Sequence, residues 1–315
     1  MTQLLVRRGI LMIPTVFFAL TAIFVLVRLV PGDAVSLLLD SSQYSQADAE
    51  QLREQMGLND SIPVQYGKFM RQAVTGDFGK SMWTGQPVMK ELLVHRLPIT
   101  LELSAAAVFF GIAIGIPLGV LAALKQDSII DYVVRSVAIA GLSIPGFWIA
   151  TLLLVLPVYW WNWAPPFGYE SILDEPWTHI QQIFIPASVM SLSLSAVLMR
   201  MTRSMMLEVF RQDYVRTAHA KGLSGGIVIL RHCLRNGMLP VLSIIGVQVA
   251  VLMAGTVVYE SIFTLPGVGS YLYEGVTRRD YPVVQGVAVM LTIAVLIVNM
   301  LIDISYRIAD PRVRI

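Results

Sequence analysis

The sequence predicts an all-α integral membrane protein with six transmembrane helices and both termini in the cytoplasm. Of its 315 residues, 56% are hydrophobic and 14% are charged, whereas roughly 25% are charged in a typical soluble domain. Six apolar runs are each long enough to cross a hydrocarbon core of ~30 Å, which takes about 20 helical residues. None of the runs shows the period of two that marks a transmembrane β-strand. Because lipid offers the backbone no hydrogen-bond partner, we expect helices.

The six runs cover residues 9–30, 97–124, 132–161, 180–199, 237–259 and 283–301. The first follows Arg7 and Arg8, as the apolar part of a cleavable secretory signal would. It is longer than the ~7–15 apolar residues of such a signal, and no A-x-A cleavage site follows it. We therefore expect a retained membrane span.

The orientation follows from the distribution of Lys and Arg, which are enriched in cytoplasmic loops. One set of short segments holds 14 cations, whereas the two short loops of the other set hold only Arg278 and Arg279. The loop 162–179 has three acidic residues and no Lys or Arg. The 14-cation side, which includes both termini, is therefore expected to face the cytoplasm.

This topology divides the chain into three parts. Residues 1–96 hold the first span and an external segment, and residues 97–304 form a five-helix transmembrane domain with a cytoplasmic loop at about 200–236. Residues 305–315 form a cytoplasmic tail. The external run from Gly76 to Ser81 resembles a phosphate-binding loop, but Val74 stands where that motif needs its first glycine. We interpret the run as a turn or a contact for a partner.

The loop at 200–236 is the densest cationic stretch, with seven Lys or Arg against Glu208 and Asp213. One interpretation is an anchor on anionic lipid headgroups. Nucleic-acid binding is not expected, because the stretch has two aromatic residues and no recognition motif.

A short helix is expected inside this loop, opened by an acidic residue and closed by Gly222. Its spacing would put Tyr214, Val215 and Ala218 on one face, with Leu223 as a further candidate. The helix lies between two spans and has small residues that allow close approach, which suits docking against a cytoplasmic partner. Arg216 and Lys221 lie elsewhere and would pair with acidic groups of that partner. The docking residues are Asp213, Tyr214, Val215, Arg216, Thr217, Ala218, His219, Ala220, Lys221, Gly222 and Leu223.

These residues resemble the coupling loop of type I ABC importer permeases, in particular the B-type membrane subunit of the dipeptide/oligopeptide/nickel family. The general loop reads E-A-A-x-x-x-G, and here Arg216-Thr217-Ala218 and Gly222 take those places, followed by Leu239-Pro240. Further signatures of the family resemble runs at 30–33, 76–81, 97–103, 231–236, 260–269 and 310–312. The resemblance covers essentially the whole chain.

The resemblance implies the fold of a type I ABC importer transmembrane domain in the bacterial inner membrane, and a role in moving a small peptide by alternating access. Its implied partners are a homologous second permease, two cytoplasmic ATPases that bind ATP and Mg²⁺, an external solute-binding protein and membrane lipid. Nickel and glutathione permeases share the same motifs, so those substrates remain alternatives. No cofactor is expected in this chain.

Three groups of residues within the spans are candidates for a role. Gly111, Gly115 and Gly119 form a tandem G-x-x-x-G, which allows another helix to approach closely; static packing and gating are both open. Pro145 frees a backbone carbonyl, so the run containing Ser143 and Phe147 is a candidate for the pathway or gate, with simple helix kinking as the alternative. Glu102 would face either the lipid headgroups or the mouth of a cavity.

Other classes of membrane protein fit less well. An enzyme is not expected, because the spans have no His and carboxylate constellation, there is no Walker A motif, and the single Cys233 makes neither a catalytic pair nor a metal site. A secondary transporter, the main rival, would often have ten or more spans and paired ionisable groups near the midplane. A channel would need a ring of selectivity groups.

Overall fold

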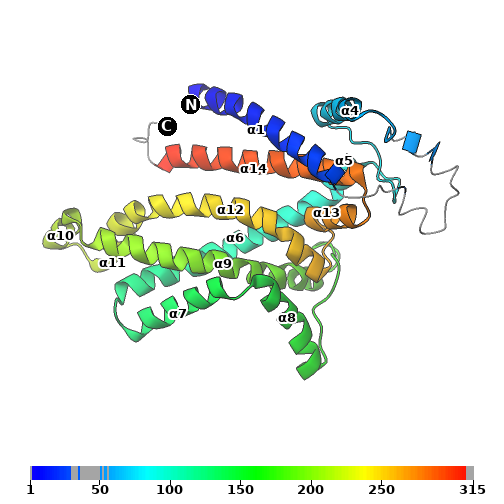
Figure 1. The fold of residues 1–315 in the computed structure, drawn as a ribbon. Coiled ribbons are helices and arrows are strands. Elements are labelled where there is room, and N and C mark those ends of the chain that lie inside the picture. The colour runs from blue at the N-terminus through cyan, green and yellow to red at the C-terminus, as the bar shows by residue number, and fades with distance from the viewer. Residues whose placement is uncertain (1, 30–34, 36–49, 52, 55–56, 310–315) are drawn as a thin grey trace. The chain divides into compact units, whose positions relative to one another are not determined.

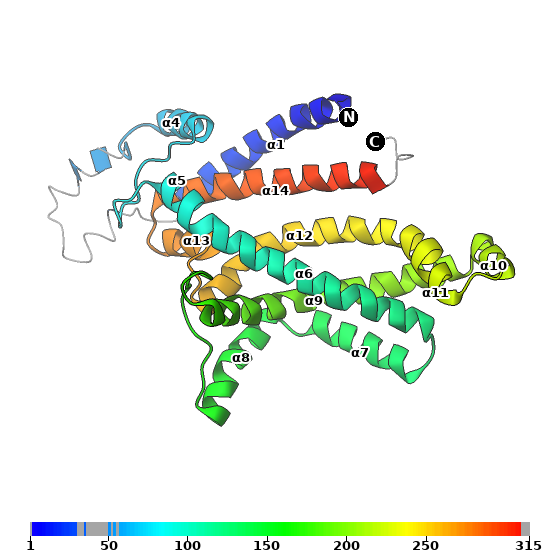
Figure 2. The same ribbon diagram turned by 180° about the vertical axis from the view of Figure 1, so that it is seen from behind.

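The computed structural model of the chain describes residues 2–29, 35, 50–51, 53–54 and 57–309. Over these residues the chain is helical, and no β-strand forms apart from an isolated bridge between Lys80 and Pro87. The chain divides into two compact units, Met1–Thr100 with Pro266–Ile297, and Leu101–Leu265 with Val298–Ile315. Figures 1 and 2 show their helices from opposite sides.

The first unit is built around two long helices that lie side by side, α1 (Thr2–Leu29) and α14 (Tyr281–Ala309) (Figure 1). Its shorter elements are α4 (Ile62–Thr75), α5 (Val88–Lys90), the π-helical turn η1 (Glu91–Arg96) and α13 (Val268–Thr277). A buried apolar cluster joins Phe24 of α1 to Phe69 of α4 and Val287 of α14. Burial of these side chains fixes α4 onto α1 and α14.

The run from Gly76 to Ser81 is an anchoring turn of this unit. Gly76 and Gly79 have φ angles of 71° and 76°, a region that glycine adopts without steric cost. The Phe78 side chain is 3% exposed and lies in the apolar cluster. Ser81 Oγ donates a 2.7 Å hydrogen bond to the carboxylate of the buried Asp280. The run therefore connects the segment before α5 to the residues just before α14.

The second unit holds α6 (Leu97–Leu124) from Leu101 onward, α7 (Ile129–Ser143), α8 (Gly146–Trp161), α9 (Pro176–Phe210) and α12 (Arg235–Phe263). Three short elements connect α9 to α12: α10 (Asp213–Ala220), α11 (Gly225–Ile227) and the π-helical turn η2 (Val228–Leu234). Figure 2 shows α9 running alongside α6, α7 and α12. Of the five single helices long enough to cross a membrane in the described part of the chain, it is the most buried, with 67% of its apolar 18-residue window inside the protein.

Among the described residues, five helices are long and apolar enough to cross a membrane, and a bent pair of helices makes a sixth candidate. The apolar run 132–161 is broken, because α7 and α8 meet at an angle of 94°, in line with the helix kink that the sequence left open at Pro145. The cause is Pro145, which has no N–H to donate and forces Ile144 before it into an extended conformation with ψ of 125°. The motifs at 30–33 and 310–312 lie outside the described residues.

A seam of three glycines sets the distance between α6 and α9. A Cβ atom added to Gly115 would lie 2.8 Å from the backbone oxygen of Ser195, and one added to Gly119 would lie 2.8 Å from that of Met199. At Gly111 an added Cβ would overlap the Leu194 side chain. Only glycine permits two helix backbones to come this close, which is how small residues act at helix interfaces in membranes.

We expect Gly115→Ala to destabilise the protein by about 1–3 kcal/mol, because the new methyl group meets backbone that cannot rotate away. Thermal unfolding of the purified chain in mild detergent would measure the effect. Gly255→Ala is the matched control, since an added Cβ there has no neighbour within 4 Å and alanine is the better helix former. Equal unfolding temperatures for the two variants would contradict the seam.

Candidate functional site

The candidate site is α10, a two-turn helix that the chain places at the end of the second unit, beyond the C-terminus of α9 (Figure 1). It begins after Gln212, whose backbone is extended, and ends at Lys221. Gly222 then adopts a φ of 77°, and its amide donates to the carbonyl of His219 at 2.9 Å. The acidic start and glycine stop predicted from the sequence thus coincide with the ends of this helix.

Two side chains attach α10 to the rest of the unit. Val215 and Ala218 are 4% and 5% exposed and pack in a cluster with Met206 of α9, Ala123 of α6 and Cys233 of η2. The cluster therefore joins α10 to the ends of two long helices and to the segment that leads into α12. A displacement of α10 has to be passed to these elements, because packed apolar interiors are hard to compress.

The residues expected to share one face of α10 differ in exposure, and docking of this helix on a partner stays a prediction. Val215 and Ala218 are buried inside the chain itself, whereas the side chains of Tyr214 and Leu223 are 40% and 36% exposed. The spacing indicated a shared apolar face, but that face packs inward. The exposed surface of α10 consists of Asp213, Tyr214, Arg216, Thr217, His219 and Ala220, and Lys221 follows it.

The charges on this surface are available to a partner. Arg216 lies 3.7 Å from Asp213 in an ion pair whose side chains are 76% and 96% exposed. An exposed pair of this kind contributes little to stability and exchanges partners readily. Lys221 is also exposed.

Cys233, for which no catalytic partner is expected, is fully buried in η2. Burial raises the pKa of its thiol above the ordinary value, so the thiolate form that nucleophilic chemistry needs is disfavoured. The residue acts as a small packing group beneath α10.

Glu102 belongs to a polar cluster at the other end of this unit. Its carboxylate accepts hydrogen bonds from the Tyr169 hydroxyl at 2.9 Å and pairs with His179 Nε2 at 2.6 Å. The other ring nitrogen of His179 lies 2.8 Å from the carbonyl oxygen of Glu170, and Gln182 binds the loop backbone at Phe167 and Glu170. The loop between α8 and α9 is thereby fastened to α6 and α9.

The polar cluster shifts the pKa of Tyr169 and buries His179. Burial and the adjacent Glu102 carboxylate raise the pKa of the Tyr169 hydroxyl to about 12. His179 is 3% exposed and lies in α9. Sequence reasoning missed His179 as the partner of Glu102, because the two are 77 residues apart and no periodicity links them.

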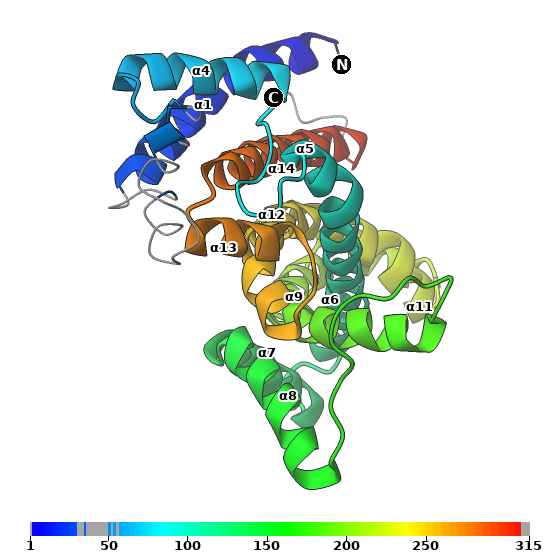
Figure 3. The same cartoon turned by 90° about the vertical axis from the view of Figure 1, so that its right-hand side faces the viewer.

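The Ser143, Pro145 and Phe147 group lies at the break between α7 and α8, where α8 turns away from the axis of α7 (Figure 3). All three residues are exposed in the chain alone. Behind the break, an added Cβ on Gly146 would overlap the hydroxyl of Tyr259 in α12, so the start of α8 is held close to α12. A role of the group in the pathway remains a prediction.

The motif at 97–103 also acts as a junction. Thr100 is 1% exposed, and its hydroxyl accepts a 2.8 Å hydrogen bond from the backbone N–H of Val268. That N–H belongs to the first turn of α13, which has no partner within its own helix. The hydroxyl of Thr100, at the start of α6, thus satisfies an N–H group at the start of α13.

The sequence is similar to known proteins along its whole length. Residues 115–315 match the family described as "Binding-protein-dependent transport system inner membrane component", and residues 1–104 match its N-terminal membrane component. The chain belongs to this family. The family resemblance read from the sequence motifs is confirmed, and membership places the chain in the inner membrane as part of a binding-protein-dependent transport system.

Relatives match over nearly the full length. The chain is 39% identical to the dipeptide transport system permease protein DppB of Escherichia coli K12, covering 100% of this chain and 99% of that protein. It is 37% identical to DppB of Alkalihalophilus pseudofirmus, with 98% of each covered. A putative peptide transport system permease protein of Brucella abortus is 39% identical, covering 100% of this chain and 99% of that protein.

Solved structures show the same fold. An inward-facing structure of the MetNI methionine ABC transporter superposes with a TM-score of 0.54 and 18% identity, covering 70% of this chain and 98% of that chain. An amino acid ABC transporter gives a TM-score of 0.50 at 17% identity, covering 67% and 91%. The predicted type I importer fold is therefore confirmed.

We expect His179→Ala to loosen the loop between α8 and α9. Losing a buried hydrogen-bond partner costs on the order of 1–3 kcal/mol, so amide hydrogen exchange at residues 167–173 should accelerate by about tenfold or more. His95→Ala is the control, because His95 is exposed in η1. Unchanged exchange in the His179 variant would contradict the role of this cluster.

Proposed function

We propose that this chain is a permease subunit of an ATP-driven importer of short peptides. The proposal is supported by its family and by relatives named as dipeptide and peptide permeases that match it over nearly their whole length. Nickel and glutathione, which the motifs alone left open, are not favoured by these relatives. Substrate recognition is proposed to rest largely with an external binding protein.

The observation that carries the mechanism is the attachment of α10. Its inner side chains are buried against α6, α9 and η2. Its outer surface is exposed and carries Arg216, and the exposed Lys221 follows it. We infer that this outer surface docks on an ATPase subunit and that the buried cluster transmits the movement of the ATPase to the spans. Two conformations separated by a few kcal/mol would then alternate, as a ligand-shifted equilibrium requires.

The proposed assembly contains a homologous second permease, two cytoplasmic ATPases that bind ATP and Mg²⁺, and an external solute-binding protein. ATP hydrolysis is assigned to the ATPases, and both termini of this chain to the cytoplasm. The break between α7 and α8 supports a position for Ser143, Pro145 and Phe147 near the pathway, because an interrupted helix leaves backbone groups that suit a cavity. Glu102 is proposed to hold the external loop in place through His179.

Reconstituted transport tests this function. Vesicles holding the full complex with ATP inside, and a labelled dipeptide with the binding protein outside, are expected to accumulate the label. Vesicles lacking the ATPases, or lacking ATP, are expected to accumulate none. Uptake by this chain alone without ATP would overturn the proposal in favour of a secondary transporter.

The end of α10 offers a test of coupling. We expect Gly222→Val to leave membrane insertion intact and to uncouple ATP hydrolysis from uptake, because valine at a φ of 77° is strained and shifts the end of the docking helix. The readout is the number of dipeptides moved per ATP hydrolysed.

Gly226→Val is the control for this coupling test. Gly226 lies in α11, has no positive φ, and has open space around an added Cβ. Normal coupling in the Gly222 variant would remove the basis for a docking helix that ends there.

A further inference from the structure

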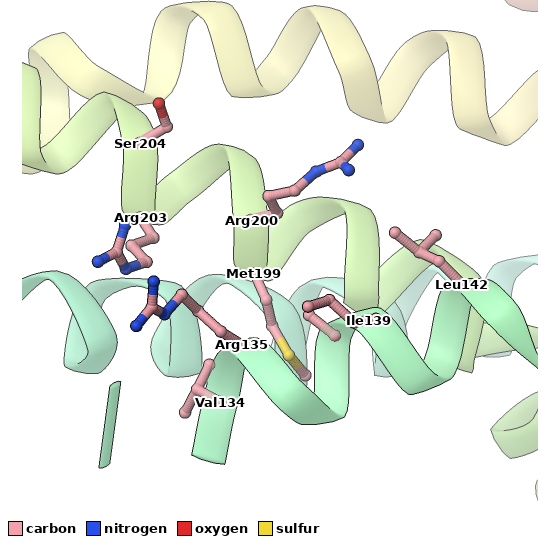
Figure 4. Close-up of a pocket in the computed structure, with 9 residues that line it drawn as sticks. Val134, Arg135, Ile139, Leu142, Met199, Arg200, Arg203 and Ser204 are labelled. Atoms are coloured by element: carbon pink, nitrogen blue, oxygen red, sulfur yellow. The ribbon is translucent and has the colours of Figure 1, made fainter. Parts of the chain in front are cut away.

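A groove of about 260 Å³ lies between α7 and α9 and is lined by cationic and apolar side chains. Figure 4 shows the Arg135 and Arg203 side chains close together and that of Arg200 extending away from them. The cations are Arg135 of α7 and Arg200 and Arg203 of α9. The floor includes Val134 and Met199, which are 8% and 4% exposed. Ile139 lines the groove and is 64% exposed, so the groove is open along α7.

The fully buried carboxylate beside these cations is that of Asp131, which does not neutralise all three charges. Arg203 binds Asp131 in a bidentate pair, with Nε at 2.6 Å and a terminal nitrogen at 2.7 Å. Asp131 is fully buried, and its carboxylate also accepts the backbone N–H of Asp127 at 3.0 Å. This pair fixes the guanidinium of Arg203 at one end of the groove.

Two positive charges then remain without a carboxylate of their own. Arg135 Nε lies 3.6 Å from Asp131, is buried, and makes no hydrogen bond. Its guanidinium carbon lies 4.6 Å from the centre of the Tyr132 ring. Arg200 is exposed and forms no ion pair among the residues that the structure describes. Among the residues that the structure describes, Asp131 is the carboxylate that pairs with these arginines, and Asp127 also acts electrostatically on Arg203, so three positive charges face two negative ones along the groove.

The position of the groove defines what can reach it. Both α7 and α9 belong to candidate membrane spans. Arg135 lies about midway along α7, and Arg203 lies toward the C-terminal end of α9, from which the chain enters α10. The distribution of Lys and Arg assigns this end to the cytoplasm. The groove therefore opens at the depth of the headgroups and upper acyl chains of the inner leaflet.

We propose that this groove is a binding site for an anionic phospholipid of the inner leaflet. The phosphate binds Arg135 and the unpaired edge of the Arg203 guanidinium, Arg200 adds positive potential at the rim, and an acyl chain lies along Val134, Ile139 and Met199. Basic pockets between transmembrane helices on the cytoplasmic side suit such headgroups. Uncompensated cations beside an open apolar floor match a ligand that combines an acidic head with an apolar tail.

A lipid-binding measurement on the full chain tests this site. The chain in mild detergent is titrated with phosphatidylglycerol and, separately, with phosphatidylcholine of the same acyl chains, and bound lipid is counted by native mass spectrometry. We expect a clear preference for phosphatidylglycerol. In Arg135→Gln/Arg200→Gln, which leaves the Arg203 pair with Asp131 intact, its affinity should fall about tenfold or more, with phosphatidylcholine unaffected.

The matched control is Arg211→Gln/Arg231→Gln, which removes two exposed cations from the same side of the protein but outside the groove. We expect it to keep the preference for phosphatidylglycerol. Glycerol 3-phosphate, which has the phosphate but no acyl chain, is expected to compete poorly. Equal binding of the two lipids, an equal loss in the control, or competition by glycerol 3-phosphate as strong as by the lipid would overturn the proposal.

The other possible occupant is the second permease subunit. Ile139→Cys in the assembled complex is expected to stay accessible to a lipid-soluble thiol reagent. Efficient cross-linking of that cysteine to the second permease would show that protein covers the groove and would overturn the lipid site. These measurements require no transport, so their failure leaves the proposed importer function unaffected.

Discussion

The close approach of α6 and α9 is the constraint on which the second unit depends. In a bilayer the hydrophobic effect gives little driving force for helix association, because lipid tails are as apolar as the side chains, so helices associate by close packing. Gly111, Gly115 and Gly119 allow that packing by leaving space for the backbone and side chains of α9. Once α9 is fixed in this way, it presents Arg203 to α7, Met206 to α10 and His179 to the loop between α8 and α9.

The same helix therefore links events at both ends of the unit. At one end, the cluster beneath α10 contains side chains from α6, α9 and η2. At the other end, His179 of α9 and Glu102 of α6 hold the loop after α8. A change in the separation or tilt of these two helices alters both clusters together. Through α6 and α9, the cluster beneath α10 is thus physically connected to the loop between α8 and α9.

Several sequence signatures proved to be structural junctions of the chain. The run from Gly76 to Ser81 binds Asp280 through a buried hydroxyl, and Thr100 satisfies an N–H of the first turn of α13. Buried polar groups need partners because an unpaired one costs free energy comparable to a lost hydrogen bond. Such residues hold helix ends in place, which accounts for their presence in segments that carry no chemistry of their own.

The sequence by itself determined the helical class, the approximate spans, the family and the ends of α10, because these follow from hydrophobic run length and from local signals such as Gly222. Tertiary structure decided the break at Pro145, the burial of Val215 and Ala218, and the pairing of His179 with Glu102 and of Arg203 with Asp131. An apolar face shows that a helix packs, but its partner depends on residues distant in sequence. Only the folded chain brings them together.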